Sequence, residues 1–359
     1  MVRHNIVDRS LRRGLDLSAL LGLCGLTIVH PGAVLAQPTV QIAVLDVKPD
    51  FRGDGAGPAG DLSGIACLEP QARIRTCVVI NDENNSAQLV SLDATKLAPG
   101  ELVELVGAGA NPVAFGQPPS FACLKSGKFG DLDGEAVSRS GDIFYVVGSH
   151  GCSRKKGEFR LAAFQLARFR LLDGHAVQIE LTYRLTEALA RSAALKPFMG
   201  KPLSPDGGVN IEGLAVIGDM LFAGLRGPAN DKALIVRTSA SALFSNARRK
   251  AASQVIPVPM GLNTGIRDLA AMPDGRLLVL GGPSLEQDIP YQLYAFDPGH
   301  RAKPIKLAEL PRVLTADGEP AKAEAVAVLA QQPGKVTVLV LFDGISNGSP
   351  RVYEIDVPQ

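Results

Sequence analysis

The sequence predicts an all-β fold, a β-propeller of five four-stranded blades closed by an N-terminal strand. The first observation is composition, because the chain is 46% hydrophobic and contains 38 Gly, 25 Pro and no Trp. Such a mixture favours short strands joined by turns. The second observation is a unit of up to four short apolar runs that recurs five times. Short strands at near-regular spacing are typical of a sandwich, a barrel or a propeller, and the repeated four-strand unit favours the propeller.

The first 36 residues are predicted to be a secretory signal. Arg12 and Arg13 belong to a basic segment that precedes an apolar run at residues 17–29, and residues 34–36 offer a small-residue cleavage site. A membrane anchor is the alternative, although the run is short for a span, and the Sec and twin-arginine routes both stay open. We therefore expect a periplasmic or secreted protein without stable membrane insertion, whose single domain covers residues 37–359.

Each repeated unit begins with a polar turn that leads into an apolar strand. The best copy, NIEGLA, begins at Asn210, and all five copies share an alanine in the sixth place. The copies begin at residues 61, 131, 210, 265 and 322. Second runs follow at residues 77–80, 143–147, 221–223, 277–280 and 336–342, third runs at 88–92, 161–166, 233–236, 292–296 and 351–357, and fourth runs at 101–106, 177–183, 254–258 and 304–307.

The fifth unit lacks a fourth run, whereas residues 39–47 precede the first unit and have no place in it. We expect this N-terminal strand to complete the last blade, because that arrangement removes two sheet edges at once. Residues 186–196 have a helical composition and end before Pro197, which predicts a short helix. The units are unequally spaced, with large insertions at residues 107–130 and 186–205, and a sixth blade within them is the main alternative.

Four cysteines follow the predicted signal: Cys67, Cys77, Cys123 and Cys152. An even number in an exported chain indicates disulfides. The first two end and begin adjacent strands of the first blade, and the other two are expected at one rim of the second, so we predict the pairs Cys67–Cys77 and Cys123–Cys152. No C-x-x-C spacing occurs, which argues against a thiolate metal site.

The starts of the innermost strands and the ends of the second strands lie at the same rim of a propeller. Their polar residues should therefore meet at one mouth of the central channel. Carboxylates there suit calcium, Arg and Lys suit anions, and a histidine suits proton transfer; acids that merely tie blades together are the structural alternative. The catalytic candidates are His150, Glu212 and Arg226, the metal candidates are Asp133, Glu212 and Glu324, and the ligand-binding candidates are Asp82, Glu83, Asp133, Lys155, Lys156, Arg267, Glu324 and Asp343.

The formal net charge of the chain is only +1, which gives no electrostatic case for nucleic acid or an anionic membrane as partner. We expect a monomer whose partner is a small-molecule ligand or an unknown protein. No cofactor is certain from the sequence, and calcium is the candidate.

An ordered set of motifs carries a resemblance. It consists of NIEGLA, GLRGP, GSHG followed by Lys155-Lys156-Gly157, and DLSGIA with Asn81-Asp82-Glu83. The set resembles a bacterial family catalogued as domain of unknown function 3616, over roughly residue 61 to the C-terminus. The resemblance implies a β-propeller-like fold, distantly similar to phytase-like and esterase-like propellers, and no established activity. This chain departs from the family's acidic motif in having Asp133 where Glu is expected, and in opening the fourth unit with Arg267.

The leading interpretation is an exported propeller that binds a polar or anionic small molecule at the channel mouth, alone or with a divalent cation. One alternative is a metal-assisted hydrolase of an ester, phosphoester or lactone. Carboxylates would hold the ion, Arg226 and Lys155 the anion, and His150 would move a proton. The other alternative is a non-catalytic interaction scaffold that uses the same mouth.

Overall fold

The computed structural model describes residues 40–53, 55, 57–107, 113–125, 130–154, 156–300 and 303–358. The predicted signal at residues 1–36 and the candidate Lys155 lie outside these described residues. Residues 36–359 form one compact unit. Within the described part of the chain, no helix combines the length and the apolar character needed to cross a membrane.

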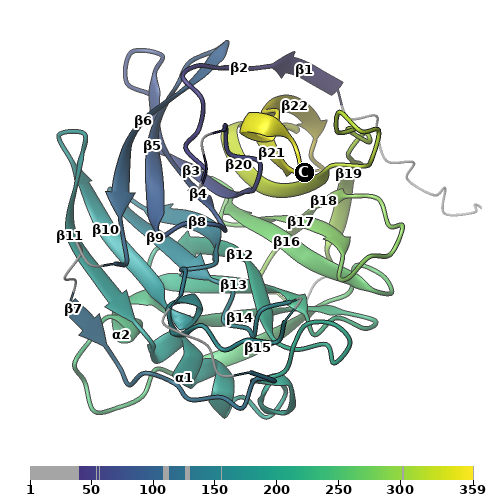
Figure 1. Cartoon of the computed structure of the whole chain (residues 1–359). Coiled ribbons are helices and arrows are strands. Elements are labelled where there is room, and N and C mark those ends of the chain that lie inside the picture. The colour runs from purple at the N-terminus through teal and green to yellow at the C-terminus, as the bar shows by residue number, and fades with distance from the viewer. Residues whose placement is uncertain are drawn as a thin grey trace, which may run out of the picture. The chain divides into compact units, whose positions relative to one another are not determined.

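The predicted propeller of five blades is confirmed (Figure 1). The innermost strands touch one another in a closed ring, from β3 through β8, β12, β16 and β20 back to β3. From the inside outwards, the first blade contains β3 (Leu62–Cys67), β4 (Arg75–Asn81), β5 (Ser86–Leu92) and β6 (Lys96–Glu104). The second contains β8 (Gly134–Ser140), β9 (Ile143–Gly148), β10 (Leu166–Leu172) and β11 (His175–Thr182). The third contains β12 (Asn210–Ile217), β13 (Met220–Gly227), β14 (Ala233–Ser239) and β15 (Ser253–Val258). The last two contain β16 (Thr264–Ala271), β17 (Leu277–Pro283), β18 (Gln292–Phe296) and β19 (Ile305–Glu309); and β20 (Lys322–Gln332), β21 (Lys335–Asp343), β22 (Arg351–Asp356) and β1 (Val40–Val44).

The N-terminal strand closes the last blade, as predicted. β1 pairs antiparallel with β22, so the first described strand lies beside the C-terminal one (Figure 1). The predicted single strand at residues 39–47 is nevertheless two strands, because the chain must cross from the last blade to the first. After the buried Leu45, β2 (Asp46–Val47) pairs in parallel with β6 at the outer edge of the first blade. One segment thus holds both sides of the ring closure.

Three further local differences from the predicted elements occur. The third run of the second blade, residues 161–166, is mostly a buried 3-10 helix, η1 (Leu161–Phe164), and the strand β10 follows it. The expected helix is α1 (Arg184–Arg191), which begins and ends earlier than predicted and is followed by η2 (Lys196–Phe198). β7 (Val113–Phe115) adds a fifth, parallel strand to the second blade.

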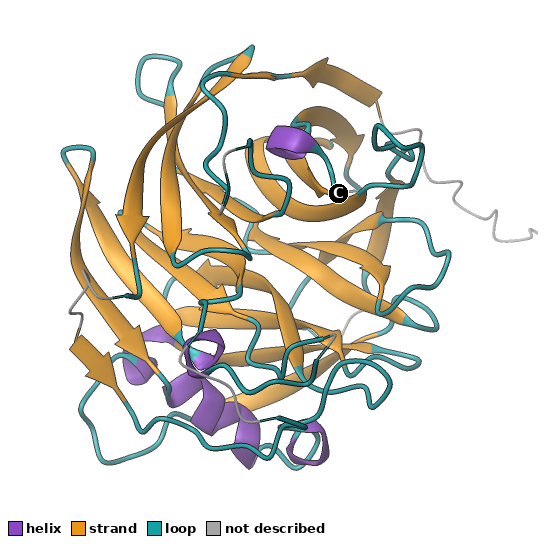
Figure 2. Ribbon diagram, viewed as in Figure 1, coloured by secondary structure: helices purple, strands orange, loops and turns teal. Residues whose placement is uncertain are grey.

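Most of the helical turns gather beside the second and third blades (Figure 2). They include α2 (Ala240–Leu243), which follows β14. The last turn, η3 (Ser346–Gly348), precedes β22 instead. The framework of the ring remains the five sheets.

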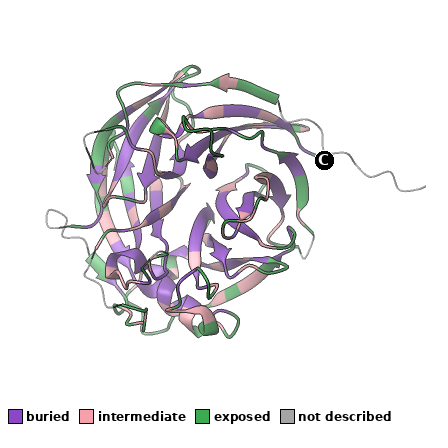
Figure 3. Ribbon diagram, turned by 45° about the vertical axis from the view of Figure 1, so that its right-hand side comes forward, coloured by how far each residue is buried: buried purple, intermediate pink, exposed green. Residues whose placement is uncertain are grey.

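The apolar core lies between neighbouring blades, as five clusters that each join the facing sides of two sheets. Buried residues accordingly concentrate on the inner and middle strands (Figure 3). The glycine of the repeated start allows this close approach. A Cβ added at Gly64 would lie 2.7 Å from the backbone nitrogen of Val137 on the next inner strand.

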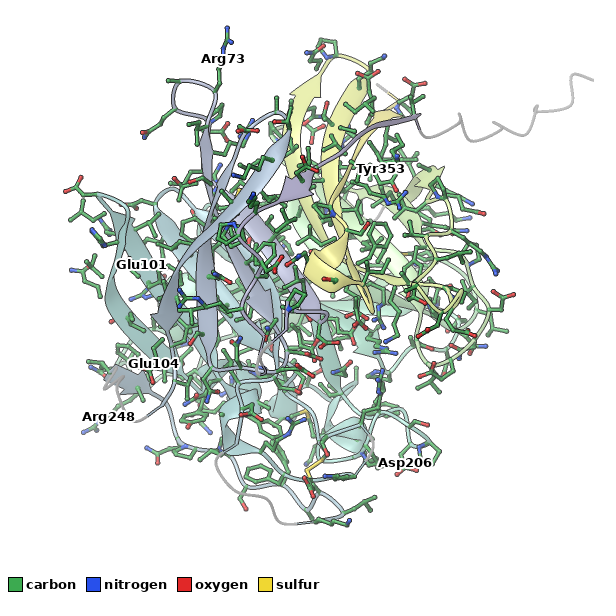
Figure 4. The ribbon with its side chains drawn as sticks, turned by 45° about the horizontal axis from the view of Figure 1, so that its top comes forward. Arg73, Glu101, Glu104, Asp206, Arg248 and Tyr353 are labelled. Atoms are coloured by element: carbon green, nitrogen blue, oxygen red, sulfur yellow. A yellow bond between two sulfur atoms is a disulfide. The ribbon has the colours of Figure 1, made fainter. Side chains whose placement is uncertain are left out.

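Both predicted disulfides are present. Cys67 and Cys77 lie directly opposite each other on β3 and β4, and Cys123 is joined to Cys152. We call Cys67–Cys77 the far-rim disulfide and Cys123–Cys152 the mouth disulfide. The two rims are at opposite ends of the blades. Figure 4 shows this through Arg73, on the turn between β3 and β4, and Asp206, on the loop that leads into β12.

Candidate functional site

A pocket of about 440 Å³ lies at the mouth where the inner strands begin. We call it the mouth pocket. Starts and corners of several blades line it together, as the predicted geometry required. Its charged lining contains more carboxylates than cations: Asp82, Asp131, Asp133, Glu135, Glu158, Glu212, Glu324 and Asp343 against Arg154, Lys156, Arg160, Arg226 and Lys322.

A β-bulge at the same level of every inner strand builds the floor of this pocket. In each strand the register with its neighbour shifts across one extra residue. Bulges re-aim side chains and are common next to functional sites. The five extra residues, which we call the bulge ring, are Ser63, Glu135, Glu212, Arg267 and Glu324.

The bulge ring corrects the repeat alignment in the second blade. The sequence pattern aligned Asp133 with Glu212, whereas the register places Glu135 at the equivalent position. The apparent departure from a glutamate at this place therefore disappears. Asp133 lies two residues earlier and is ion-paired with Arg160 at 3.0 Å.

Ion pairs fix one side of the floor. The Nη1 of Arg226 donates to the Oε1 of Glu212 at 2.7 Å, so these two residues meet as predicted. Arg267 lies fully buried beneath them, 3.0 Å from the other oxygen of Glu212, and pairs also with Glu324. The network joins the third, fourth and fifth blades. Its carboxylates therefore act first as ties between blades, because removing one partner of a buried pair leaves an uncompensated charge.

A second buried tie was missed by the sequence analysis. The carboxylate of Asp268 accepts backbone N–H bonds at 2.7 Å from Leu269 and from Val326 on the next inner strand. Burial raises the pKa of Asp268 well above its usual value, even though these hydrogen bonds lower it.

Asp61, just before β3 of the first blade, and Asp343, at the end of β21 in the fifth blade, form a hydrogen-bonded pair of acids. Burial, followed by a hydrogen bond to Asp343, raises the pKa of Asp61 to about 7. Burial opposes ionisation of Asp343 as well, but Lys322, whose Nζ lies 2.6 Å away, and Asp61 hold its pKa below the usual value. Below about pH 7, Asp61 therefore keeps its proton and donates it to Asp343.

Four carboxyl groups that line the mouth pocket make no ion pair within the described part of the chain: those of Asp131, Glu158, Asp82 and Glu135. The buried Oδ1 of Asp82 also has no hydrogen-bond partner among the described residues. Burial, with Asp133 adding to it, raises the pKa of Asp82 to about 8. Burial and the neighbouring Glu212 raise the pKa of Glu135 well above its usual range. Asp82 should therefore hold a proton at neutral pH unless a positive charge approaches it.

Positively charged side chains lie at the outer rim of the mouth pocket. Arg154 and Lys156 are exposed on a loop that begins at Cys152, and neither makes an ion pair within the described residues. The mouth disulfide anchors this loop, and the backbone N–H of Lys125 donates to the oxygen of Gly157 at 3.0 Å. Among the described residues, the pocket thus combines acids without an ion pair at its floor with cations without an ion pair at its rim.

Three candidates do not line the pocket. His150 is completely buried in the corner after β9, with φ at 54°, its Nδ1 2.9 Å from the oxygen of Gly148, and its Nε2 unpartnered among the described residues. Burial lowers the pKa of His150 to about 4, so it is neutral and away from the ligand space. Glu83 is exposed on the corner after β4, and Arg267 lies under the floor.

Several solved structures are similar to the chain at low identity. One is the PQQ-bound aldose sugar dehydrogenase from Streptomyces coelicolor, with 12% identity, 91% of this chain and 100% of that chain covered, and a TM-score of 0.41. Another is the α-L-arabinanase from Penicillium chrysogenum complexed with arabinobiose, with 9% identity, 90% and 98% covered, and a TM-score of 0.39. A protein from Lactobacillus plantarum matches with 14% identity, 80% and 67% covered, and a TM-score of 0.35.

No curated protein matches the chain. A family model described as "Protein of unknown function (DUF3616)" matches residues 173–354. The matched segment includes the motifs NIEGLA and GLRGP that form the pair Glu212–Arg226, but not the corner that holds His150. Because this segment spans half of the 359-residue chain, the protein belongs to the DUF3616 family of proteins of unknown function.

Proposed function

We propose that the mouth pocket binds a small polar molecule that places a positively charged group, such as a protonated amine, against Asp82 and Glu135. The observation that carries this proposal is that the partly buried Asp82 and Glu135 make no ion pair among the described residues, whereas four neighbouring acids of the pocket do: Asp133, Glu212, Glu324 and Asp343. Arg154 and Lys156 would receive an anionic or polar group of the same ligand at the rim. The protein is, on this proposal, a binding protein.

Hydrogen-bond requirements support the same ligand class. The buried Oδ1 atoms of Asp82 and Asn210 both lack a partner among the described residues. Buried acceptors of this kind are nearly always satisfied in folded proteins, and an ammonium group supplies three donors. A cation beside Asp82 would also lower its raised pKa, so binding near neutral pH should release protons.

Calcium is the alternative source of positive charge, since carboxylates are its ordinary ligands. Among the residues that the structure describes, however, no group of three or more His, Cys, Asp or Glu side chains is arranged to hold a metal ion. We propose an organic cation, and the titration below includes calcium as the competing ligand.

A hydrolase is the second candidate, because the pocket holds acids whose pKa values are pushed apart. The pKa of Asp82 is raised to about 8, whereas that of Asp343 is lowered. Such divergence is typical of acid–base pairs in catalysis. Asp82 would protonate the leaving oxygen of an ester, phosphoester or lactone, and Asp343 would take a proton from the attacking water.

The test is calorimetric titration of the purified protein with spermidine, putrescine and calcium chloride at pH 7. Each titration is repeated in two buffers of different ionisation enthalpy, which reveals proton release. We expect amine binding with release of up to about one proton, and loss of that release in Asp82→Asn. Asp206→Asn, an exposed aspartate on the same side of the molecule, is the control. Absence of amine binding, or unchanged proton release in Asp82→Asn, would refute the proposal.

Two observations bear on the compartment in which the protein acts. Two disulfides agree with an oxidising compartment, and the N-terminal sequence has the form of a secretory signal. We propose that the protein works as a monomer in the periplasm or outside the cell. Fractionation of cells that express the tagged full chain, with size measurement of the exported product, tests both points.

A further inference from the structure

We propose that the ligand is amphipathic, with its amine in the mouth pocket and an apolar alkyl or aryl group in a groove beside it. The inference rests on the proposed function and deepens it by naming the ligand class. A second cavity of about 440 Å³ opens between the fourth and fifth blades. We call it the side groove.

The side groove and the mouth pocket share a wall. Arg226 and Lys322 line both cavities, so a ligand that fills the pocket can extend across these two residues without leaving the protein surface. Both cations are already committed, Arg226 to Glu212 and to the backbone oxygen of Ser284, and Lys322 to Asp343. The junction therefore requires no charge from the ligand.

The far walls of the side groove are mainly apolar, although Glu286, Gln287 and Glu319 also line them. Two connections form them, residues 284–291 between β17 and β18 and residues 310–321 between β19 and β20. Four prolines line the groove and restrict the conformations of its walls. Arg312 and Asp288 at its edge pair with each other. The apolar side chains that face it include Leu285, Ile289, Tyr291, Leu310, Val313 and Phe342.

An apolar group in this groove would be removed from water at the same time as the amine replaces protons at the floor. Small-molecule pockets commonly combine an apolar lining with a few placed polar groups, as these two cavities do together. Burial of one methylene contributes about 0.8 kcal/mol, which corresponds to about fourfold in affinity. The ligand class is therefore a primary amine with an alkyl chain or an aromatic ring.

The experiment titrates n-alkylamines, from ethylamine to octylamine, into the purified protein, with proton release followed as above. In the wild type we expect the dissociation constant to fall about two- to fourfold per methylene along the series. The double variant Leu285→Ser/Ile289→Ser should lose this dependence and keep the binding and proton release seen with spermidine. Leu314→Ser is the matched control, because Leu314 is exposed on the same connection but does not line the groove.

The outcomes separate this inference from the proposed function. Proton release with spermidine but no dependence on chain length would overturn the amphipathic ligand and leave the mouth pocket standing. An equal dependence in the double variant would place the chains elsewhere and would also overturn it. A dependence on chain length without proton release in the wild type would refute the proposed function, and with it a ligand that bridges both cavities.

Discussion

Replacing Asp82 with Asn should stabilise the protein at pH 7, which is the reverse of the usual effect of a mutation at a buried polar site. Asp82 is an acid without an ion pair among the described residues, and its neighbours Asp133 and Glu324 are also acids. Ionising Asp82 in the folded protein therefore opposes burial and two negative charges. Asn keeps the shape of the side chain and removes the charge.

The magnitude follows from the pKa of Asp82, raised by burial to about 8 from an ordinary 3.8. Between these two values the folded protein keeps a proton that the unfolded chain has lost, so stability falls as pH rises. The contribution is fully present below pH 4 and is lost as pH approaches 8. One pKa unit corresponds to 1.4 kcal/mol, so this group alone should lower the free energy of unfolding by about 3 kcal/mol between pH 5 and pH 7.

Denaturant unfolding at pH 5 and pH 7, with both disulfides intact, measures this effect. The wild type should lose more stability than Asp82→Asn over the interval. The variant should keep some pH dependence, because burial also raises the pKa values of Asp61 and Glu324 to about 7. The control Asp206→Asn should follow the wild type. An Asp82→Asn protein that is less stable than the wild type at pH 7, or that has the same pH dependence, would refute the reasoning.

Three further perturbations test the fold and the rim. Glu212→Gln should lower the free energy of unfolding by about 3 kcal/mol, because it leaves two buried arginines short of a partner; an unchanged melting temperature would contradict the network. Replacing both cysteines of the mouth disulfide with Ser should weaken ligand binding more than the same change in the far-rim disulfide, in paired calorimetric titrations, since only the former anchors the cationic loop. Deleting residues 40–47 should cause aggregation or a large fall in melting temperature, because it exposes edges of the first and last blades; an equally stable truncated protein would show that closure lies elsewhere.

The sequence was sufficient for the ring, because the repeated start and the alternating apolar runs report local strand structure directly. It was insufficient where the same residue types are compatible with both a helix and a strand. Residues 161–166 are apolar in any conformation, and a short buried run cannot be assigned to helix or strand by periodicity alone. There, Ala162, Ala163 and Phe164 are buried in η1.

The choice between Asp133 and Glu135 shows why the candidate site was harder to predict. Both residues are acidic, and both fit the repeated start. Only the hydrogen-bond register between β8 and β9, with its shift between Gly134 and Ala136, decides which one takes the bulged position. The lack of a hydrogen-bond partner for the Oδ1 of Asp82 among the described residues likewise depends on the tertiary structure, since the surroundings of Asp82 come from the first, second and fifth blades.

The bulge ring explains why Glu135 makes no ion pair among the described residues. Neighbouring blades contribute one ring residue each, and Arg267 stands between Glu212 and Glu324, so one arginine neutralises part of the charge of both. Glu135 stands on the other side of Glu212, towards Ser63, and these two positions supply no cation. The ring is therefore compensated on the side of the fourth and fifth blades and acidic on the side of the first and second. Asp82, at the corner of the first blade, adds its carboxyl group to that acidic side. Because ion pairs already join the blades of the compensated sector, the acidic sector is the part of the ring whose carboxyl groups a ligand in the mouth pocket could compensate.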